Sequence, residues 1–435
     1  MLVGRDREVE ELEAALAQLA TGSGSLVLMA GEPGIGKTRL ATEAALRAKA
    51  RGLRVSWGQC WEAGGAPALW PWREAYQGLG VAFPEARALA GADPAESRFE
   101  LFRDATAGLL EVAPCVIVLE DLHAADRSTL MLLEFVATQR ALPLLVIGTY
   151  RELEASLSRD TAASLGRAGR HAKMFVLARL REAEVAALVH DAIADADAKL
   201  TASVFATTGG NPLFVGEIVR EWRATGATDQ IPLGVREVIR QRLALISPEA
   251  RRVLEIGAVF GVEFAREDVT RIEPRAAAVL EEAQRSGFVT TRGARFRFTH
   301  ALYREALYHD LVRALRHELH REAALVLRTH GAPLSEIAHH LLEAGPDAAP
   351  EAIEHAIRAA DQAVAVFAFE DATALLERAR SAIPAGADEA AQRCRVMIAQ
   401  GELQLRSGDA AGRAVCVEAA TLARSLANPA LLARA

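Results

Sequence analysis

A glycine-rich stretch near the start of the chain constrains its fold more than any other feature. Residues 26–40 read LVLMAGEPGIGKTRL, where an apolar run leads into the pattern G-x-x-x-x-G-K-[ST] and then into a helical pattern. A glycine-rich turn that arises by chance lacks the flanking strand and helix. In the expected geometry, backbone N–H groups of the loop surround a phosphate at the positive end of the helix. The stretch therefore predicts a nucleotide site, with contacts from Gly31, Gly34, Ile35, Gly36, Lys37, Thr38 and Arg39.

Side chains with predicted roles in chemistry come from this loop and from a second segment. Lys37 is expected to reach the β- and γ-phosphates, and the Thr38 hydroxyl is expected to bind Mg²⁺. The segment 115–123, CVIVLEDLH, is an apolar strand that ends in two acids. Glu120 is placed to hold Mg²⁺, directly or through water, and Asp121 to orient or deprotonate the attacking water. The predicted catalytic residues are Lys37, Glu120 and Asp121, and the predicted metal ligands are Thr38 and Glu120.

Further apolar runs predict a parallel sheet. The runs 53–58, 144–148 and 173–177 alternate with helical patterns. This alternation is typical of an α/β domain with helices on both faces of the sheet and a ligand at the carboxyl ends of the strands. Arg151 follows one of these runs, and its guanidinium is suited to sensing a γ-phosphate. The alternative is an arginine that is solvated at a strand end. We expect this P-loop domain at residues 1–180.

Composition limits the class of protein. The chain has 435 residues, of which 51% are hydrophobic and only 5% aromatic, so a helix-rich protein of about three domains is expected. Its formal charge of −7 argues against a nucleic-acid surface over most of the chain. The four cysteines are scattered and are expected to be reduced thiols. Since the chain has neither a signal peptide nor a long apolar run, we predict a cytoplasmic protein with no membrane segment.

The remainder of the chain is predicted to be mainly helical, in three parts. Residues 181–230 are expected to form a helical lid that ends in a polar linker at 225–232. Residues 231–300 combine short helices, one of them at 234–246, with two alternating runs around a glycine, as in a winged-helix domain. Residues 301–435 place small residues at a spacing close to that of tetratricopeptide repeats, with a plain helical bundle as the alternative. Because this pattern continues to the last residue, we expect the native chain to be longer.

The set of motifs resembles the STAND class of signal-transduction ATPases. More closely, it resembles the N-terminal part of the large ATP-binding LuxR-type transcription regulators of bacteria, over nearly the whole chain. The specificity comes from the set and its order, since P-loops alone occur in many unrelated proteins. The motifs are the P-loop, VGR at 3–5, EDLHAAD at 120–126, TYR at 149–151, GGNPLF at 209–214, and FTHAL and REALY at 298–302 and 304–308.

The resemblance implies a switch that uses ATP, ADP and Mg²⁺. It implies that Val3, Gly4 and Arg5 line the adenine pocket, that Pro212 touches the base from the lid, and that Arg151 senses the γ-phosphate. A closed ADP-bound form would open when an inducer binds and ATP replaces ADP, and the open form would then self-associate. Hydrolysis would be a slow reset of the switch.

The sequence departs from this family in two places. Ala124 stands where the family often has tryptophan, so a packing contact is expected to be missing. The helix-turn-helix of such regulators is absent from these 435 residues. DNA contact is therefore expected only through a further C-terminal domain, because the arginines of the predicted winged helix are interleaved with acids.

Two other classes of protein share parts of this pattern. One is the ATPase module of a signalling protein linked to a nucleotide cyclase or a kinase. The other is a stand-alone AAA+ type ATPase, which needs an arginine finger supplied in trans.

An inducer, either a small molecule or a protein, is expected on the concave surface of the helical repeats. Four histidines, His300, His309, His317 and His320, are expected on helix surfaces and not in a metal site.

Overall fold

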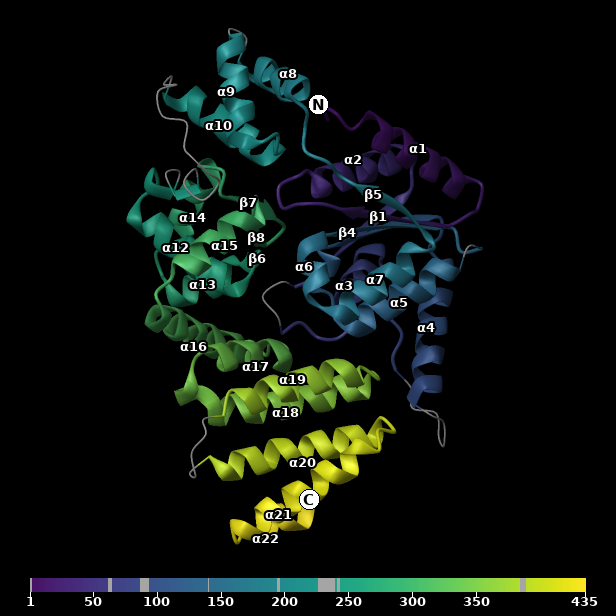
Figure 1. Cartoon of the computed structure of the whole chain (residues 1–435), viewed down its shortest axis with the longest axis vertical. Coiled ribbons are helices and arrows are strands. Elements are labelled where there is room, and N and C mark those ends of the chain that lie inside the picture. Colours follow the sequence, from purple (N-terminus) through teal and green to yellow (C-terminus); the bar gives the residue numbers. More distant parts are fainter. Residues whose placement is uncertain are drawn as a thin grey trace.

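The computed structural model shows a sheet domain followed by a largely helical region (Figure 1). It describes residues 2–61, 65–86, 94–139, 141–193, 196–225, 239–240, 243–383 and 389–435. Most of the predicted linker at 225–232 and of the predicted helix at 234–246 lies outside the described residues, as does the predicted boundary at 230/231. Within the described residues, no helix is both long and apolar enough to cross a membrane.

The sheet domain is built on five parallel strands in the order β2-β3-β4-β1-β5. This confirms the predicted parallel α/β sheet. The three middle strands are almost completely buried, which explains why they read as continuous apolar runs without alternation. The strands are β1 (Ser25–Ala30), β2 (Arg54–Gln59), β3 (Cys115–Glu120), β4 (Leu144–Tyr150) and β5 (Ala172–Val176).

Helices cover both faces of this sheet. Two helices pack on one face, and their apolar stripes meet side chains of β1, β3 and β4. The other face carries four helices, and Trp72 ties two of them together by donating from Nε1 to the Thr129 carbonyl at 3.1 Å. The first pair is α1 (Asp6–Ala20) and α2 (Lys37–Ala50), and the second set is α3 (Trp70–Leu79), α4 (Pro94–Leu110), α5 (Arg127–Thr138) and α7 (Arg159–Gly169).

Three helices follow the sheet domain and form a small core of their own. The chain turns sharply between the last two, at Gly209 and Gly210, whose φ angles of 54° and 78° are positive. A β-carbon on Gly210 would lie 2.0 Å from the Leu180 carbonyl oxygen, so only glycine fits at this position. The helices are α8 (Glu182–Ala192), α9 (Ala198–Thr208) and α10 (Pro212–Thr225).

A second sheet, antiparallel and of order β6-β8-β7, lies among four helices. We call this part the three-stranded unit. The predicted alternating runs around a glycine form its hairpin, β7 (Val289–Arg292) and β8 (Arg295–Phe298). Its other elements are β6 (Glu263–Ala265), α12 (Pro248–Phe260), α13 (Arg266–Ile272), α14 (Ala276–Arg285) and α15 (Ala301–Asp310).

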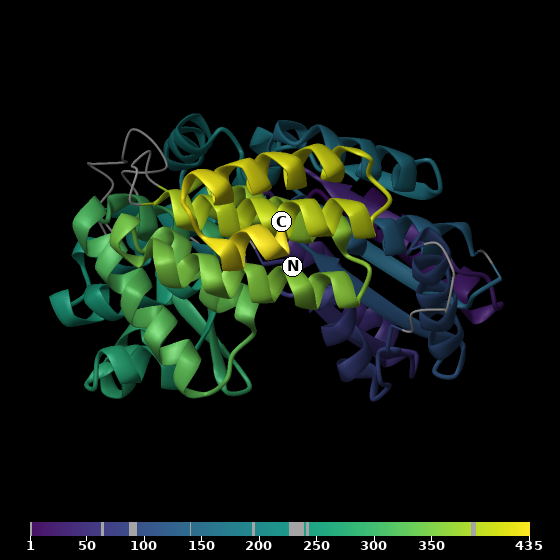
Figure 2. The same ribbon diagram turned by 90° about the horizontal axis from the view of Figure 1, so that it is seen from below.

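The remaining helices form a stack in which neighbours in sequence lie side by side (Figures 1 and 2). One prediction is wrong here: His320 is only 1% exposed, because it lies on the apolar stripe of α16 beside Leu319. The described residues hold no group of His, Cys, Asp and Glu that is arranged to bind a metal ion. The helical stack consists of α16 (Arg313–Thr329), α17 (Leu334–Glu343), α18 (Ala349–Ala365), α19 (Phe369–Ser381), α20 (Ala390–Arg406), α21 (Ala411–Ser425) and α22 (Pro429–Arg434).

Candidate functional site

The predicted phosphate loop joins β1 to α2 at the carboxyl edge of the sheet. Gly36 caps the helix with a left-handed backbone at φ 105°, and the space above its α-carbon is open. Gly34 also has a positive φ, 77°, and a β-carbon there would lie 2.7 Å from the Leu213 side chain. Glycine is therefore required at both positions, at Gly36 by the backbone and at Gly34 by a neighbour as well. The amino end of α2 faces the cavity described below.

Lys37, the first residue of α2, lies under the loop. Its ammonium group donates to the carbonyls of Gly31 and Glu32 at 2.8 and 2.9 Å, and the residue is 8% exposed. These carbonyls stabilise a charge that burial would otherwise penalise. The same hydrogen bonds hold the ammonium group near the centre of the loop.

Glu120, at the end of β3, joins the P-loop to the three-stranded unit. Its Oε1 accepts a hydrogen bond from the Thr38 hydroxyl at 2.6 Å, and its Oε2 accepts one from Arg297 Nη1 at 2.9 Å. Glu120 is 1% exposed and the Arg297 side chain 18%. Thr38 and Glu120 were predicted to act together, and the structure brings them into direct contact. Their hydroxyl and carboxylate oxygens are donors that fit Mg²⁺.

Asp121 follows Glu120 with a left-handed backbone, φ 59°, which turns its side chain out of the strand direction. Its N–H donates to the Thr149 hydroxyl at 3.2 Å, and its Oδ2 accepts from Gln59 Nε2 at 2.8 Å. The carboxylate is thus oriented from β2 and the backbone from β4, the strands on either side of β3. A positive φ in a residue other than glycine is uncommon and is found often at functional sites.

Arg151, at the end of β4, is buried and hydrogen-bonded to acidic side chains, so it is not an arginine solvated at a strand end. Only 6% of the residue is exposed. Its Nη1 donates to Glu305 Oε1 on α15 at 2.6 Å and lies 3.4 Å from Glu154 Oε1. Its N–H points to His123 Nδ1 at 3.4 Å. Arg151 is thus the second side chain of the site, after Glu120, that pairs with a residue of the three-stranded unit.

The turn before α10 is fastened to the P-loop. Asn211 is 2% exposed and donates from Nδ2 to the Pro33 carbonyl at 3.0 Å. The N–H of Leu213 points to the Gly34 carbonyl at 3.3 Å and to Asn211 Oδ1 at 3.1 Å. Pro212 is thereby held beside the loop.

The segment 3–5 lies behind the loop. Arg5 donates from Nη2 to the carbonyls of Ile35 and Ala178, at 3.2 and 2.7 Å, so its guanidinium braces the P-loop from outside. Burial lowers the pKa of Arg5, although Glu8 and Glu184 oppose that shift. A β-carbon on Gly4 would lie 2.7 Å from the Glu184 side chain of α8.

A cavity of about 430 Å³ lies between the P-loop, α10 and the three-stranded unit. Its walls are partly residues that the sequence predicted and partly residues that it did not, among them Arg297 and His300. Val3, Gly4, Arg5, Gly31, Ile35 and Glu120 lie outside this lining. The predicted residues that line the cavity are Gly34, Gly36, Lys37, Thr38, Arg39, Asp121, Arg151 and Pro212.

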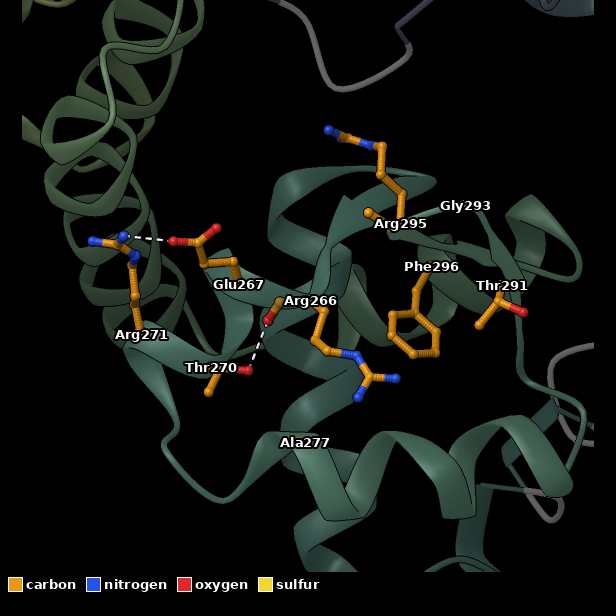
Figure 3. Close-up of a pocket in the computed structure, with 10 residues that line it drawn as sticks. Arg266, Glu267, Thr270, Arg271, Ala277, Thr291, Gly293, Arg295 and Phe296 are labelled. Carbon is orange, nitrogen blue, oxygen red and sulfur yellow. Dashed lines mark hydrogen bonds and ion pairs between the residues drawn. The ribbon is translucent and has the colours of Figure 1, made fainter.

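A larger cavity, about 610 Å³, lies on the three-stranded unit and shares no lining residue with the first (Figure 3). There the Arg266 guanidinium lies 5.1 Å from the centre of the Phe296 ring, and Arg271 pairs with Glu267 at 2.6 Å. The smaller cavity is the candidate nucleotide site, because P-loop groups predicted to bind phosphate line it.

Sequence reasoning missed four residues that act on the site: Gln59, Asn211, Arg297 and Glu305. Asn211 and Glu305 lie within the motifs GGNPLF and REALY, but neither motif indicates the partner of the residue. Arg297 and Glu305 reach partners 177 and 154 residues away along the chain, and no local pattern marks such contacts.

Comparison with known proteins agrees with this geometry. Residues 1–147 match the sequence profile of the AAA ATPase domain. Among solved structures, a signal transduction ATPase with numerous domains (STAND) from Pyrococcus horikoshii, with a tetratricopeptide repeat sensor, is 15% identical with a TM-score of 0.57. The match covers 98% of this chain and 65% of that one. The N-terminal third is thus an AAA-type, ATP-binding module, and the chain has the fold of that STAND protein.

Two further solved structures match with lower TM-scores. The Walker-type ATPase of Pyrococcus abyssi is 16% identical, with a TM-score of 0.36 over 70% of this chain and 96% of that one. The ORC2 protein of Aeropyrum pernix is 13% identical, with a TM-score of 0.37 over 76% of this chain and 95% of that one. No curated protein matches the chain.

Proposed function

We propose that this chain is an ATP-driven signalling switch, the sensor and ATPase part of a bacterial LuxR-type transcription regulator. ATP hydrolysis is slow and resets the switch, and an inducer drives self-association of the ATP-bound form. The motif set and its order support this function, together with the ion pairs that connect the nucleotide cavity to the three-stranded unit.

The shared carboxylate of Glu120 carries the proposal. An acid at this position of a P-loop ATPase serves the metal that bridges the β- and γ-phosphates. Here one oxygen faces Thr38 and the other binds Arg297 of the three-stranded unit. A change at the phosphates therefore alters the contact that holds the three-stranded unit, and such a shared group couples nucleotide state to domain arrangement.

The other side chains have the following proposed roles. Lys37 exchanges its loop carbonyls for the β- and γ-phosphate oxygens of ATP. Thr38 and Glu120 would hold Mg²⁺, which would supply charge neutralisation at the phosphates. Asp121, fixed from two neighbouring strands, orients the attacking water or takes its proton. Arg151 leaves Glu305 and pairs with the γ-phosphate, which ADP lacks.

The division of the chain is part of the proposal. Residues 1–180 are the ATPase domain and residues 181–230 the lid, while Val3, Gly4 and Pro212 lie at the adenine. The order of helices and hairpin supports a winged-helix domain at 231–300, and the paired helices support tetratricopeptide-like repeats at 301–435. The repeats receive the inducer. DNA contact belongs to a further C-terminal domain.

Sedimentation velocity with ADP and with a non-hydrolysable ATP analogue, each with Mg²⁺, tests this function. The Arg297→Gln variant takes the place of the inducer, because it removes a contact that holds the three-stranded unit. In this variant we expect a monomer with ADP, which stabilises the closed form, and larger species with the ATP analogue. Lys37→Ala should abolish both nucleotide binding and this response. Identical sedimentation with the two nucleotides in the Arg297→Gln variant, at saturating binding, would contradict the switch.

A further inference from the structure

A short segment at the start of α19 is anchored on the sheet domain. The Glu370 carboxylate accepts from Arg98 Nη1 of α4 at 3.1 and 3.2 Å, and it lies 3.7 Å from Arg127 Nε of α5. The next residue, Asp371, accepts from the Arg127 N–H at 3.1 Å and from the Ser128 hydroxyl at 3.0 Å. The two acids thus occupy the positive end of α5 and the arginines beside it.

Two aromatic residues complete this contact. Phe367 is 7% exposed and belongs to the apolar core of the sheet domain, and Phe369 packs against the same core. Phe367 has a positive φ of 59°, which is a strained conformation for a bulky residue. We call residues 367–371 the plug. Since its backbone is strained, its contacts with the sheet domain must hold it in place.

The site of the plug continues into an open groove along α4, α5 and α7. This groove, about 490 Å³ in volume, contains Phe99, Phe102, Met131 and Phe135, with Arg98 and Arg127 at the plug end. The rings of Phe99 and Phe102 lie 5.5 and 5.9 Å from that of Phe135. Phe99 is 53% exposed.

We propose that this groove is the docking surface for an amphipathic helix of a partner protein, which carries an aromatic residue followed by two acidic residues. The plug itself shows which chemistry the arginine end accepts, namely the sequence Phe369-Glu370-Asp371. The partner repeats that pattern and displaces the plug. The inference rests on the proposed switch, because release of α19 from the sheet domain would then be the inducing signal.

The groove explains how a partner competes with a segment of the same chain. An intramolecular segment acts at a high effective concentration, so a competitor with the same contacts alone would bind weakly. The exposed ring of Phe99, beside Arg98, offers a partner additional contact area. Amphipathic helices bind such grooves through apolar residues spaced three and four apart, with aromatic anchors contributing most.

A labelled peptide with the sequence of residues 366–383 tests the proposal on the full chain. It carries the whole plug, followed by the apolar stripe Ala372, Leu375, Leu376 and Ala379, which packs on α18 within the chain but is free in the peptide. Binding is measured by fluorescence anisotropy without nucleotide, so the result is independent of ATP switching. A peptide of the same composition in scrambled order is the control.

Two matched pairs of variants locate the binding. Glu370→Arg places like charges beside Arg98 and releases the plug, whereas Glu377→Arg changes an exposed residue of the same helix away from it. We expect Glu370→Arg to bind the peptide about tenfold more tightly than either the wild type or Glu377→Arg. In the Glu370→Arg background, Phe99→Ala should weaken binding by about fivefold, and Leu110→Ala, also exposed and apolar on α4, should not.

Three results would overturn the proposal. The first is no peptide binding to Glu370→Arg when circular dichroism shows that this variant is folded. The second is peptide binding that Phe99→Ala leaves unchanged. The third is self-association of Glu370→Arg without peptide, lost on Phe99→Ala, which would assign the groove to a second copy of the chain. Unchanged ATP response with normal peptide binding would count only against the proposed switch.

Discussion

Replacing Arg297 by glutamine removes the charged contact between the three-stranded unit and Glu120. In the wild type this guanidinium lies 2.9 Å from the carboxylate of an acid that is 1% exposed. Burial acts against the charged form of Arg297, but Glu120, Asp121 and Glu263 outweigh it and raise its pKa. Arg297 therefore stays charged throughout the physiological range. Glutamine keeps most of the side-chain length and a donor but removes the charge.

The size of the effect follows from the burial of the pair. Loss of one partner of a buried ion pair costs about 3–5 kcal/mol, since the other charge stays buried. Glu120 keeps its hydrogen bond from Thr38, and the Arg297 side chain is 18% exposed, so the closed form should lose less, about 2–3 kcal/mol. At about 1.4 kcal/mol per factor of ten, the closed–open equilibrium shifts by about 30- to 150-fold.

The assay is the rate of release of a fluorescent ADP analogue, chased with unlabelled ADP in a stopped-flow instrument. We expect Arg297→Gln to release the analogue faster by a factor within that range. Arg295→Gln is the matched control, because Arg295 lies on the same strand, is 42% exposed, and pairs at 3.5 Å with Glu263 of its own unit. Release within about threefold of the wild type in Arg297→Gln would refute the reasoning, as would equal acceleration in both variants.

Two further predictions concern one catalytic group and one buried cluster. Asp121→Asn should slow single-turnover hydrolysis about 100-fold while ATP affinity in a calorimetric titration stays unchanged, and unimpaired hydrolysis would remove Asp121 from the proposed role. Burial lowers the pKa of His320 to about 2 and of His340 to about 3, both from 6.5. Because both are neutral when folded but take up protons when unfolded, the free energy of unfolding should fall below about pH 6.5, by about 1.4 kcal/mol per pH unit for each histidine. Urea unfolding of the wild type and His340→Phe measures this, and an equal slope in both would contradict it.

The sheet domain was predictable because its elements have local signatures. Each of the three middle strands is a buried apolar run, and the glycines of the P-loop mark the turn from strand to helix. Shorter or mixed signals failed. Strand β6 has three residues with only Phe264 buried, so no alternation is readable. Helix α10 begins at Pro212, within the motif GGNPLF, because proline fits the first turn of a helix.

The burial of His320 is indicated by the spacing of its apolar neighbours, but histidine as a residue type favoured a surface position. Along α16, Leu319, Ala323, Ala324 and Leu327 recur at the spacing of one helix face, and His320 lies on that face. A lone polar residue within such a stripe is buried when neighbours satisfy its nitrogens. Here the two ring nitrogens face the hydroxyl of Tyr308 and the Nδ1 of His340, each at 2.9 Å. Those partners lie on other helices, so the sequence did not reveal them.

The charged groups of the candidate nucleotide site are each paired with another group of the protein, and this pairing links ligand binding to domain arrangement. Lys37 is satisfied by carbonyls of its own loop, Glu120 by Thr38 and Arg297, and Arg151 by Glu305. A buried charge without a partner is costly, so each contact must persist until a ligand group replaces it. Two of these partners belong to the three-stranded unit. A ligand that displaces Arg297 from Glu120 or Glu305 from Arg151, as ATP is proposed to do through its γ-phosphate, therefore weakens the attachment of that unit. By thermodynamic reciprocity, detaching the unit strengthens the binding of such a ligand.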